Sequence, residues 1–161
     1  MNQYLCISDD VKLGKNVKLA KFINLYGCTI GDETKIGAFV EVQKKAFIGK
    51  NCKISSHTFI CEGVTIGDSC FVGHSVVFIN DKSPQAVNKD GSLESEKEWM
   101  ARFVETHVGK NVTIGSNATI MGGIQIGDGA MIGAGGVVTK NVPAGEVWVG
   151  NPAKLLRQRK K

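Results

Sequence analysis

Three polar residues in the middle of the chain have types and spacing that suit chemistry on a small molecule. Glu62 and Asn80 are eighteen residues apart, and each stands two residues after a large apolar residue, Ile60 and Phe78. Asp81 follows Asn80 directly. Two carboxylates and an amide at one place supply hydrogen-bond acceptors that can hold a reacting group. A solvated polar corner is the alternative interpretation of the same residues.

The three histidines are candidates for a general base or a metal site. His57 and His74 are seventeen residues apart, and no two histidines are closer than that. A histidine can take the proton of a hydroxyl nucleophile, so a required His57 would favour transfer to a hydroxyl. We expect His57 and His74 to bind substrate, with a structural corner as the alternative. The wide spacing argues against a zinc site, so we expect no metal.

The five cysteines indicate free thiols. Their number is odd and no CxxC pair occurs, which argues against a disulfide framework or a redox motif. Cys52 and Cys70 are eighteen residues apart, in slots that we expect to face the core. No histidine is spaced to activate Cys61, so we interpret all five as structural.

A six-residue repeat must position these candidates. Glycine often follows the repeated apolar residue, and a small or β-branched residue stands four positions after it. The period matches neither a helix nor a simple alternating strand, and it predicts a triangular coil with one short strand in each hexad. The repeated apolar positions, with a one-residue slip after Leu25, are Ile7, Leu13, Leu19, Leu25, Ile30, Ile36, Val42, Ile48, Ile54, Ile60, Ile66, Val72, Phe78, Val108, Ile114, Ile120, Ile126, Ile132 and Val138.

Three hexads make one coil of eighteen residues, and the chain holds enough hexads for about six coils. Residues eighteen apart should therefore stack at the strand spacing of ~4.8 Å, which places Glu62 and Asn80 at one corner. We expect an all-β parallel β-helix over residues 1–145, with one continuous aliphatic core, and a C-terminal tail over 146–161. The period alone does not supply the hand, because parallel crossovers are normally right-handed.

The repeat is interrupted after Phe78 and resumes at Val108. The intervening segment is polar and contains the turn signal NKDGS. We expect a loop over residues 80–106, and a loop this long in a compact domain is usually functional or disordered. Its apolar residues Trp99, Met100 and Phe103 indicate that part of it packs against the protein. A tolerated insertion is the alternative.

The repeat resembles the hexapeptide acyltransferase superfamily over nearly the whole chain, and this resemblance implies left-handed coils. The stretch SSHTFICEGVTIGDSCFVGHSVVFIND, residues 55–81, resembles bacterial N-acetyltransferases that act on dTDP- or UDP-linked 3-amino sugars in O-antigen and lipopolysaccharide biosynthesis. In those relatives the matching Glu, Asn and Asp line the site near the sugar amine. The resemblance therefore implies catalytic roles for Glu62, Asn80 and Asp81.

The downstream stretches IGSNATIMGGIQIGDGAMIGAGGVVTKNVP and GNPAK resemble the half of the superfamily that binds CoA, and they imply acetyl-CoA as the co-substrate. Small residues let an extended pantetheine arm approach the backbone, and basic residues can meet its phosphates, with plain solvation as the alternative for each. The residues expected to bind the cofactor are Gly122, Gly123, Ala134, Gly135, Lys140, Lys154 and Arg157.

Composition and charge narrow the partners. The net charge of +5 lies largely in the tail, so the body lacks the basic stripe of a nucleic-acid binder. No apolar run is long enough to span a membrane, and the N-terminus lacks the regions of a signal peptide, which predicts a cytoplasmic protein. Outward apolar residues such as Phe59, Phe71, Met121 and Met131 suggest association, and the resemblance implies a homotrimer.

Three functions remain open on these grounds. The first is N-acetylation of a nucleotide-linked amino sugar by direct attack of the amine on the thioester, with Glu62, Asn80 and Asp81 as its signature. The second is O-acetylation of a sugar or serine-like hydroxyl with a histidine base. The third is a solenoid scaffold without enzyme activity, which failure to bind acetyl-CoA would favour.

Overall fold

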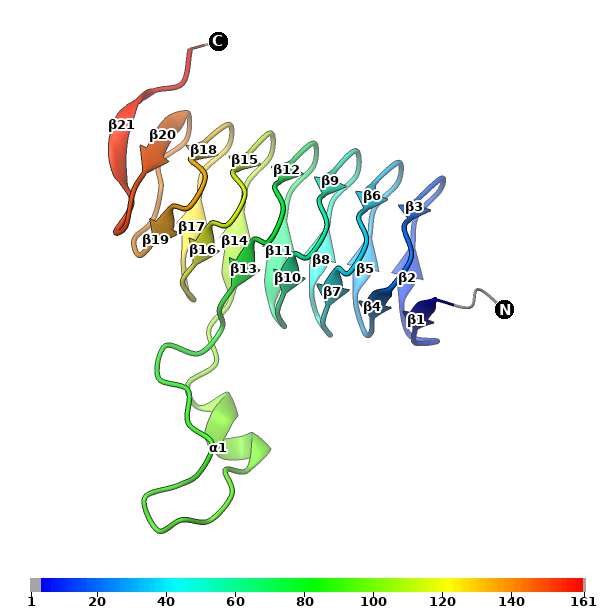
Figure 1. Cartoon of the computed structure of the whole chain (residues 1–161), viewed down its shortest axis with the longest axis vertical. Coiled ribbons are helices and arrows are strands. Elements are labelled where there is room, and N and C mark those ends of the chain that lie inside the picture. The colour runs from blue at the N-terminus through cyan, green and yellow to red at the C-terminus, as the bar shows by residue number, and fades with distance from the viewer. Residues whose placement is uncertain (1–3, 161) are drawn as a thin grey trace.

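The structure, a computed structural model, is a triangular prism of short parallel strands (Figure 1). It describes residues 4–160, so residues 1–3 and Lys161 lie outside the described part. Within residues 4–160 the strands form three sheets, and a single short helix, α1 (Glu96–Met100), belongs to the inserted loop. The expected all-β parallel β-helix is confirmed.

The three sheets are the three faces of the prism, and we call them sheets A, B and C. Sheet A contains β1 (Leu5–Ile7), β4 (Ile23–Leu25), β7 (Glu41–Val42), β10 (Phe59–Ile60), β13 (Val77–Phe78), β16 (Thr119–Ile120) and β19 (Val137–Val138). Sheet B contains β2 (Lys12–Leu13), β5 (Thr29–Ile30), β8 (Phe47–Ile48), β11 (Val64–Ile66), β14 (Thr106–Val108) and β17 (Gln125–Ile126). Sheet C contains β3 (Lys18–Leu19), β6 (Lys35–Ile36), β9 (Lys53–Ile54), β12 (Phe71–Val72), β15 (Thr113–Ile114), β18 (Met131–Ile132), β20 (Glu146–Val149) and β21 (Lys154–Gln158).

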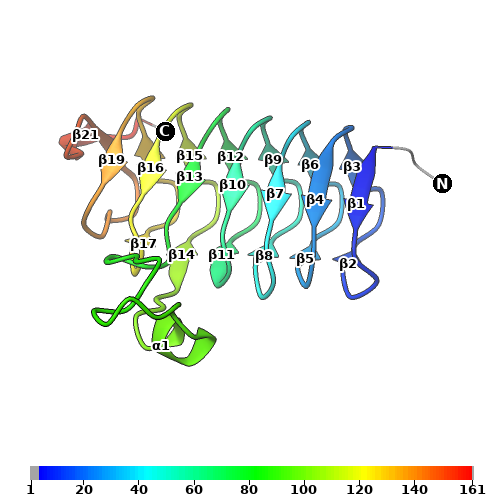
Figure 2. The same ribbon diagram turned by 60° about the horizontal axis from the view of Figure 1, so that its bottom comes forward.

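Each coil visits sheets A, B and C in turn and winds left-handed as it advances (Figure 2). The register follows the eighteen-residue coil, because Phe59 pairs with Val77 and Val77 with Thr119 across the interruption. The predicted slip is also visible: Ile7 pairs with Leu25, eighteen residues on, whereas Leu13 pairs with Ile30, seventeen residues on.

The core is a continuous column that contains the predicted apolar residues from Leu25 to Val138. The first predicted positions differ, because they lie in the end coil with no coil before it: Ile7 and Leu19 are only partly buried, and Leu13 is 43% exposed. Cys52 and Cys70 stack within the column, and the backbone N–H of Cys70 donates to Cys52 Sγ at 3.4 Å. The corners carry residues in the left-handed backbone region, and many of them are asparagine or glycine, types that adopt positive φ at low cost. The repeat therefore fixes both the filling of the prism and the turns between its faces.

The chain departs from this regular winding at two places. The inserted loop leaves sheet A after β13, projects from the prism with α1, and returns into β14 (Figure 1). At the C-terminal end, β20 pairs in parallel with β18, and β21 folds back antiparallel on β20. No helix within residues 4–160 has the length and apolar character needed to cross a membrane.

Candidate active site

The corner between sheets A and B, which we call the loop corner, brings Glu62 and Asn80 together. Asn80 Nδ2 donates a hydrogen bond to the backbone carbonyl of Glu62 at 3.2 Å. The strands that precede them, β10 and β13, are in register. The loop corner is thus built by the repeat, and the eighteen-residue spacing predicts this neighbourhood.

Asn80 presents its side-chain oxygen as an open acceptor. Its Nδ2 is occupied by Glu62, and its backbone carbonyl accepts from the N–H of Val104 at 3.0 Å. Among residues 4–160, no donor is recorded for Asn80 Oδ1, and the residue is half-buried. An amide that is anchored through nitrogen holds its oxygen in a fixed direction, which suits it to accept a hydrogen bond from a bound group.

Asp81 is buried and bound to Arg102 of the loop. Arg102 donates to Asp81 Oδ2 from Nη2 at 2.9 Å and from Nε at 3.1 Å, and the N–H of Ser83 donates to Oδ1 at 2.8 Å. The Arg102 guanidinium holds the pKa of the Asp81 carboxyl below its usual range. Arg102 also pairs with Glu94 at 2.6 Å. Asp81 is therefore ionised at neutral pH, and most of its acceptor capacity fastens the loop.

Glu62 turns its carboxylate toward the preceding coil. The side chain is buried, with Lys45 Nζ at 2.7 Å from Oε1 and Lys44 Nζ at 3.5 Å from Oε2. Lys44 also contacts Glu96 of α1 at 3.3 Å. The two lysines compensate the buried charge, and Lys44 links the prism to the helix of the loop.

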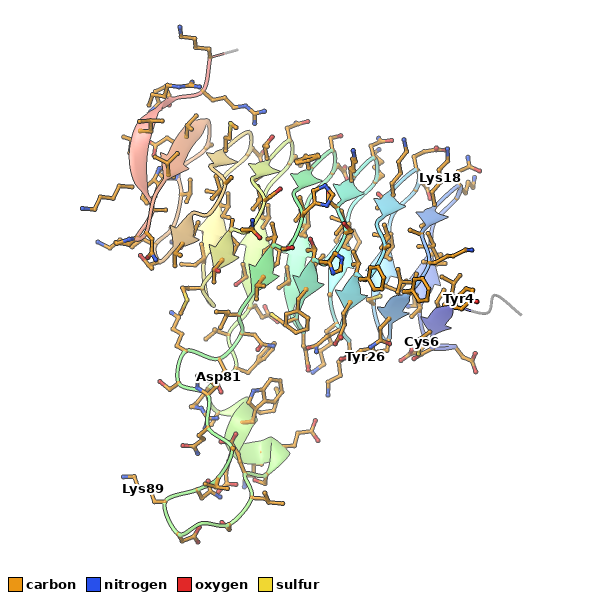
Figure 3. The ribbon with its side chains drawn as sticks, in the orientation of Figure 1. Tyr4, Cys6, Lys18, Tyr26, Asp81 and Lys89 are labelled. Carbon is orange, nitrogen blue, oxygen red and sulfur yellow. The ribbon has the colours of Figure 1, made fainter. Side chains whose placement is uncertain are left out.

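A cleft of about 440 Å³ lies between sheet A and the inserted loop. Asn80 and Asp81 line it where the loop begins, Phe59 and Val77 contribute from the outer face of sheet A, and Trp99 from α1. Figure 3 shows Asp81 at the base of the projecting loop. Glu62 does not line this cleft.

The histidines lie away from the loop corner. His57 and His74 occupy the corner between sheets C and A, where the His57 ring stacks on Phe39 at 4.7 Å between centroids. His74 Nδ1 is 2.8 Å from Ser56 Oγ. His107 lies on sheet B, 3.8 Å from Glu105. No group of three metal-ligating side chains is found within residues 4–160.

The residues predicted to bind the cofactor fall into separate places. Gly122 is buried against Val104 and the Ile79 carbonyl, so its lack of a side chain makes room for the base of the loop, and Gly123 lies beside Lys82. Ala134 and Gly135 are exposed at the corner between sheets C and A.

The basic residues of that prediction divide in the same way. Lys140 and Lys154 line one hollow of about 300 Å³ together with Trp148. Arg157 lies in β21 opposite Val147 and outside this hollow.

The sequence analysis missed three groups of this site: Lys44, Lys45 and Arg102. Lys44 stands eighteen residues before Glu62, so the coil length was a signal that could have placed it at the same corner. Arg102 lies in the non-repetitive loop, where spacing gives no position. Its role depends on contacts that only the folded loop makes.

Comparison with known proteins agrees with this architecture. The family model for the bacterial transferase hexapeptide (six repeats) matches residues 45–80 and 105–140, on both sides of the loop. The bifunctional protein GlmU of Corynebacterium glutamicum is 39% identical over 72 residues, which is 44% of this chain and 14% of GlmU. GlmU of Aquifex aeolicus is 37% identical over 123 residues, 76% of this chain and 22% of that protein. The chain thus spans less than a quarter of the length of these curated relatives.

Solved structures share the fold across the whole prism. A mutant of AntD, an N-acyltransferase from Bacillus cereus in complex with dTDP and Coenzyme A, is 22% identical with a TM-score of 0.79, covering 93% of this chain and 84% of that one. The hexapeptide-repeat acetyltransferase VCA0836 from Vibrio cholerae, complexed with acetyl-CoA, is 23% identical with a TM-score of 0.56, covering 94% and 72%. At these identities the likeness is one of fold.

Proposed function

We propose that this chain, whose repeats form a β-helix and match the hexapeptide transferase model over residues 45–80 and 105–140, is an acyl-CoA-dependent N-acyltransferase. Its acceptor is the amine of a nucleotide-linked amino sugar, and its donor is acetyl-CoA. The observation that carries the proposal is the loop corner, where Asn80 is anchored through Nδ2 and lines the cleft below the inserted loop. The shared fold with an N-acyltransferase that binds dTDP and Coenzyme A supports it.

In the proposed reaction the main task of the protein is to hold the amine and the thioester in the right orientation. The neutral amine attacks the thioester carbonyl, a C–N bond forms, and the C–S bond breaks. The amine proton passes to the departing thiolate or to water. Asn80 Oδ1 accepts a hydrogen bond from the amine N–H and aims its lone pair at the carbonyl, which lowers the barrier by orientation. A hydrogen bond that strengthens during attack raises kcat rather than only affinity.

Asp81 and Glu62 serve this site through structure. Asp81 holds Arg102, and with it the loop that walls the cleft. The Glu62 backbone carbonyl fixes the Asn80 amide, and its carboxylate holds Lys44 and Lys45. We therefore assign both acidic side chains as positioning residues beside Asn80.

Coenzyme A is proposed to bind along the C-terminal coils. Ala134 and Gly135 are exposed and leave backbone groups accessible to an extended pantetheine arm. Lys140 and Lys154 share a hollow with the ring of Trp148, which suits a phosphate beside a planar group. Arg157 and Gly123 are the remaining proposed contacts. We propose that the binding of CoA involves no metal.

We further propose that the protein works as a homotrimer in the cytoplasm, in the biosynthesis of surface glycans such as lipopolysaccharide O-antigen. The exposed Phe71 and the half-buried Met121 and Met131 offer apolar surface to a second copy. Sedimentation should give about three times the chain mass of 17.3 kDa. A monomer that turns over substrate at full rate would contradict a shared site.

The deciding experiment measures thiol release from acetyl-CoA with a panel of dTDP-, UDP- and GDP-linked amino sugars. We expect turnover with at least one of them, and none with the matching nucleotide sugar that carries a hydroxyl in place of the amine. Mass spectrometry of the product should show a single added acetyl group. Turnover with only the hydroxyl sugar would contradict the proposal.

One observation favours O-acyl transfer as a second candidate. Ser56 Oγ lies 2.8 Å from His74 Nδ1, and His74 is exposed. In the tautomer in which Nδ1 donates its proton to Ser56, Nε2 carries a lone pair and can act as a general base. Under this alternative, replacing His74 or His57 by alanine would abolish turnover, and Asn80→Ala would not. The hydroxyl sugars in the same panel are its substrates.

A further inference from the structure

An exposed column of stacked rings runs along the corner between sheets C and A over the first coils, and we call it the ring corner: Tyr4, Phe22, Phe39 and His57. The successive ring centroids are 4.8, 5.1 and 4.7 Å apart, and the last two pairs are close to parallel, at 3° and 15°. Phe22 and Phe39 remain 49% and 51% exposed. The rings stack on one another without entering the core.

The backbone at this corner is unusual for such side chains. Phe22, Phe39 and His57 have φ values of 59°, 59° and 62°, a region that bulky residues adopt at a cost in free energy. The corner between sheets B and C has the same backbone but carries Asn16, Asn51 and Asn111, among others. Strain of this kind at exposed positions points to a function rather than to stability.

The column ends abruptly at His57. The next residues at the same corner are Ser75, Asn117 and Gly135, each one coil further on. One face of the His57 ring is covered by Phe39. The side chain above the other face, Ser75, has no ring, and His57 itself is exposed. The imidazole therefore offers an open planar face at the end of a rigid stack.

A row of lysines runs beside the rings on the outer face of sheet C. Lys18, Lys35 and Lys53 are in register on adjacent strands, an arrangement in which like charges repel. Each stands four residues before one of the last three rings, in the hexads VKLAKF, TKIGAF and CKISSH, and these hexads contain no acidic residue. Figure 3 shows Lys18 at the N-terminal end of this row.

The last lysine leans toward the open end of the column. Lys53 Nζ lies 5.6 Å from the centroid of the Phe71 ring, which is one coil further on. Ser75 belongs to that same coil. The ammonium group and the open face of His57 are thus directed to the same level of the prism.

We propose that a nucleoside phosphate binds here, with its base stacked on the open face of His57 and its phosphate near Lys53. A base would continue the column by one ring. Stacking on a protein ring contributes strongly and tolerates different bases. Two molecules of the proposed function carry this chemistry, the nucleotide of the amino sugar and the adenosine of CoA. The choice between them rests on the proposed function, whereas the site itself does not.

Calorimetric titration of the full chain with dTDP, UDP and CoA, each alone, tests the site by three substitutions. His57→Asn removes the ring but keeps a residue suited to positive φ, and it should raise the Kd of one ligand about tenfold or more. His57→Phe keeps a ring and should leave Kd within about threefold. Ser75→Phe adds the next ring to the column and should abolish the same binding. The ligand whose Kd responds identifies the source of the base.

Lys53→Gln and Lys35→Gln form the matched pair for the phosphate. Lys53→Gln should weaken the responding ligand more than Lys35→Gln, whose neighbouring ring, Phe39, is already covered on both faces. Circular dichroism of each variant should match that of the parent. Unchanged Kd values for His57→Asn and Ser75→Phe in folded protein would overturn the inference.

The two proposals fail separately in these measurements. The protein could release thiol with an amino sugar while the Kd of every ligand is unchanged by substitution of His57 and Ser75. This result would contradict the ring-corner site and would still support the transferase. Nucleotide binding that depends on these rings, in a protein without acyl transfer to any acceptor, would do the reverse.

Discussion

The loop corner and the ring corner border the same sheet and use the same left-handed turns, yet they are held by different interactions. At the loop corner, Gly63 and Lys45 adopt the positive φ, and ion pairs and directed hydrogen bonds bind the neighbouring coils. At the ring corner, Phe22, Phe39 and His57 adopt it, and ring stacking replaces the ion pairs. A single backbone repeat therefore supports two surfaces of distinct chemistry.

The difference shows what each interaction can do. A charge-assisted hydrogen bond has a direction, so the loop corner fixes individual acceptors such as Asn80 Oδ1. A ring stack fixes a plane and tolerates several partners, so the ring corner suits recognition of a flat group. Reacting atoms need the fixed direction of a hydrogen bond. The non-reacting nucleotide part of a substrate can be held by ring stacking.

The largest expected effect is that of removing the acceptor at the loop corner. Asn80→Ala should lower kcat/KM for the amino sugar by ~10²-fold, mostly in kcat, because the lost hydrogen bond strengthens in the transition state. Asn51→Ala, at an exposed corner that does not line the cleft, should leave the rate unchanged. A wild-type rate for Asn80→Ala would mean that the amide does not orient the nucleophile.

The second largest effect is expected from disturbing the packing of the loop residue Phe103 against Gly63. Gly63 has a φ of 80°, and a Cβ there would collide with the ring of Phe103. Gly63→Ala should lower the free energy of unfolding by about 2 kcal/mol, by combining left-handed strain with displacement of Phe103. Gly129→Ala, with a φ of 67° and open space around it, should cost about 1 kcal/mol. Equal costs in thermal unfolding would show that Phe103 yields freely.

Removing the ion pairs of Arg102 with Asp81 and Glu94 should have a smaller effect on kcat/KM than Asn80→Ala. Arg102→Gln leaves Asp81 and Glu94 unpaired and should reduce kcat/KM about tenfold by loosening the wall of the cleft. Limited proteolysis should cut the loop faster in this variant. Arg102→Lys keeps the charge but loses the bidentate geometry, so an intermediate result is expected. If Arg102→Gln has the kinetics and the protease resistance of the parent, the ion pairs of Arg102 do not hold the loop in place.

Lowering the pH should destabilise the loop corner more than the ring corner. Arg102 depresses the pKa of Asp81 and Glu94, so the ionised carboxylates stabilise the folded loop above the ordinary carboxyl range, and this contribution is lost as pH falls through the lowered values. The protection factor of the Val104 amide, its exchange rate relative to the unfolded chain at the same pH, should therefore fall below about pH 4, because this amide is bonded to the Asn80 carbonyl at the base of the loop. The amide of His57, bonded to Ala38 at a corner without carboxylates, should respond less. An equal loss of protection at both amides would indicate global unfolding.

The smallest expected change is in the stack itself. Phe39→Asn loses two ring contacts of about 0.5–1.5 kcal/mol each and relieves left-handed strain of about 1–2 kcal/mol. The free energy of unfolding should therefore change by less than about 1 kcal/mol. Asn51→Phe gains the strain without a stack and should be destabilising. A large loss for Phe39→Asn would show that the rings serve stability rather than binding.

The six-residue period was sufficient to predict the prism and the spacing of its coils. It specified which side chains fill the core and where each corner lies, because every coil repeats the same local turn and pairs with the next at a fixed offset. That offset was enough to bring Asn80 to Glu62 and would have been enough for Lys44. The stack of Cys52 on Cys70 follows from the same arithmetic.

The partners of these polar groups, in contrast, are set by contacts that form only in the folded chain. Asp81 is bound to Arg102, Glu62 faces Lys45 rather than the cleft, and Gly122 makes room for Val104. These contacts involve the inserted loop or the direction of a side chain. A non-repetitive loop has no offset that could be read from its sequence, and the direction of a polar side chain is set by the charges it meets after folding.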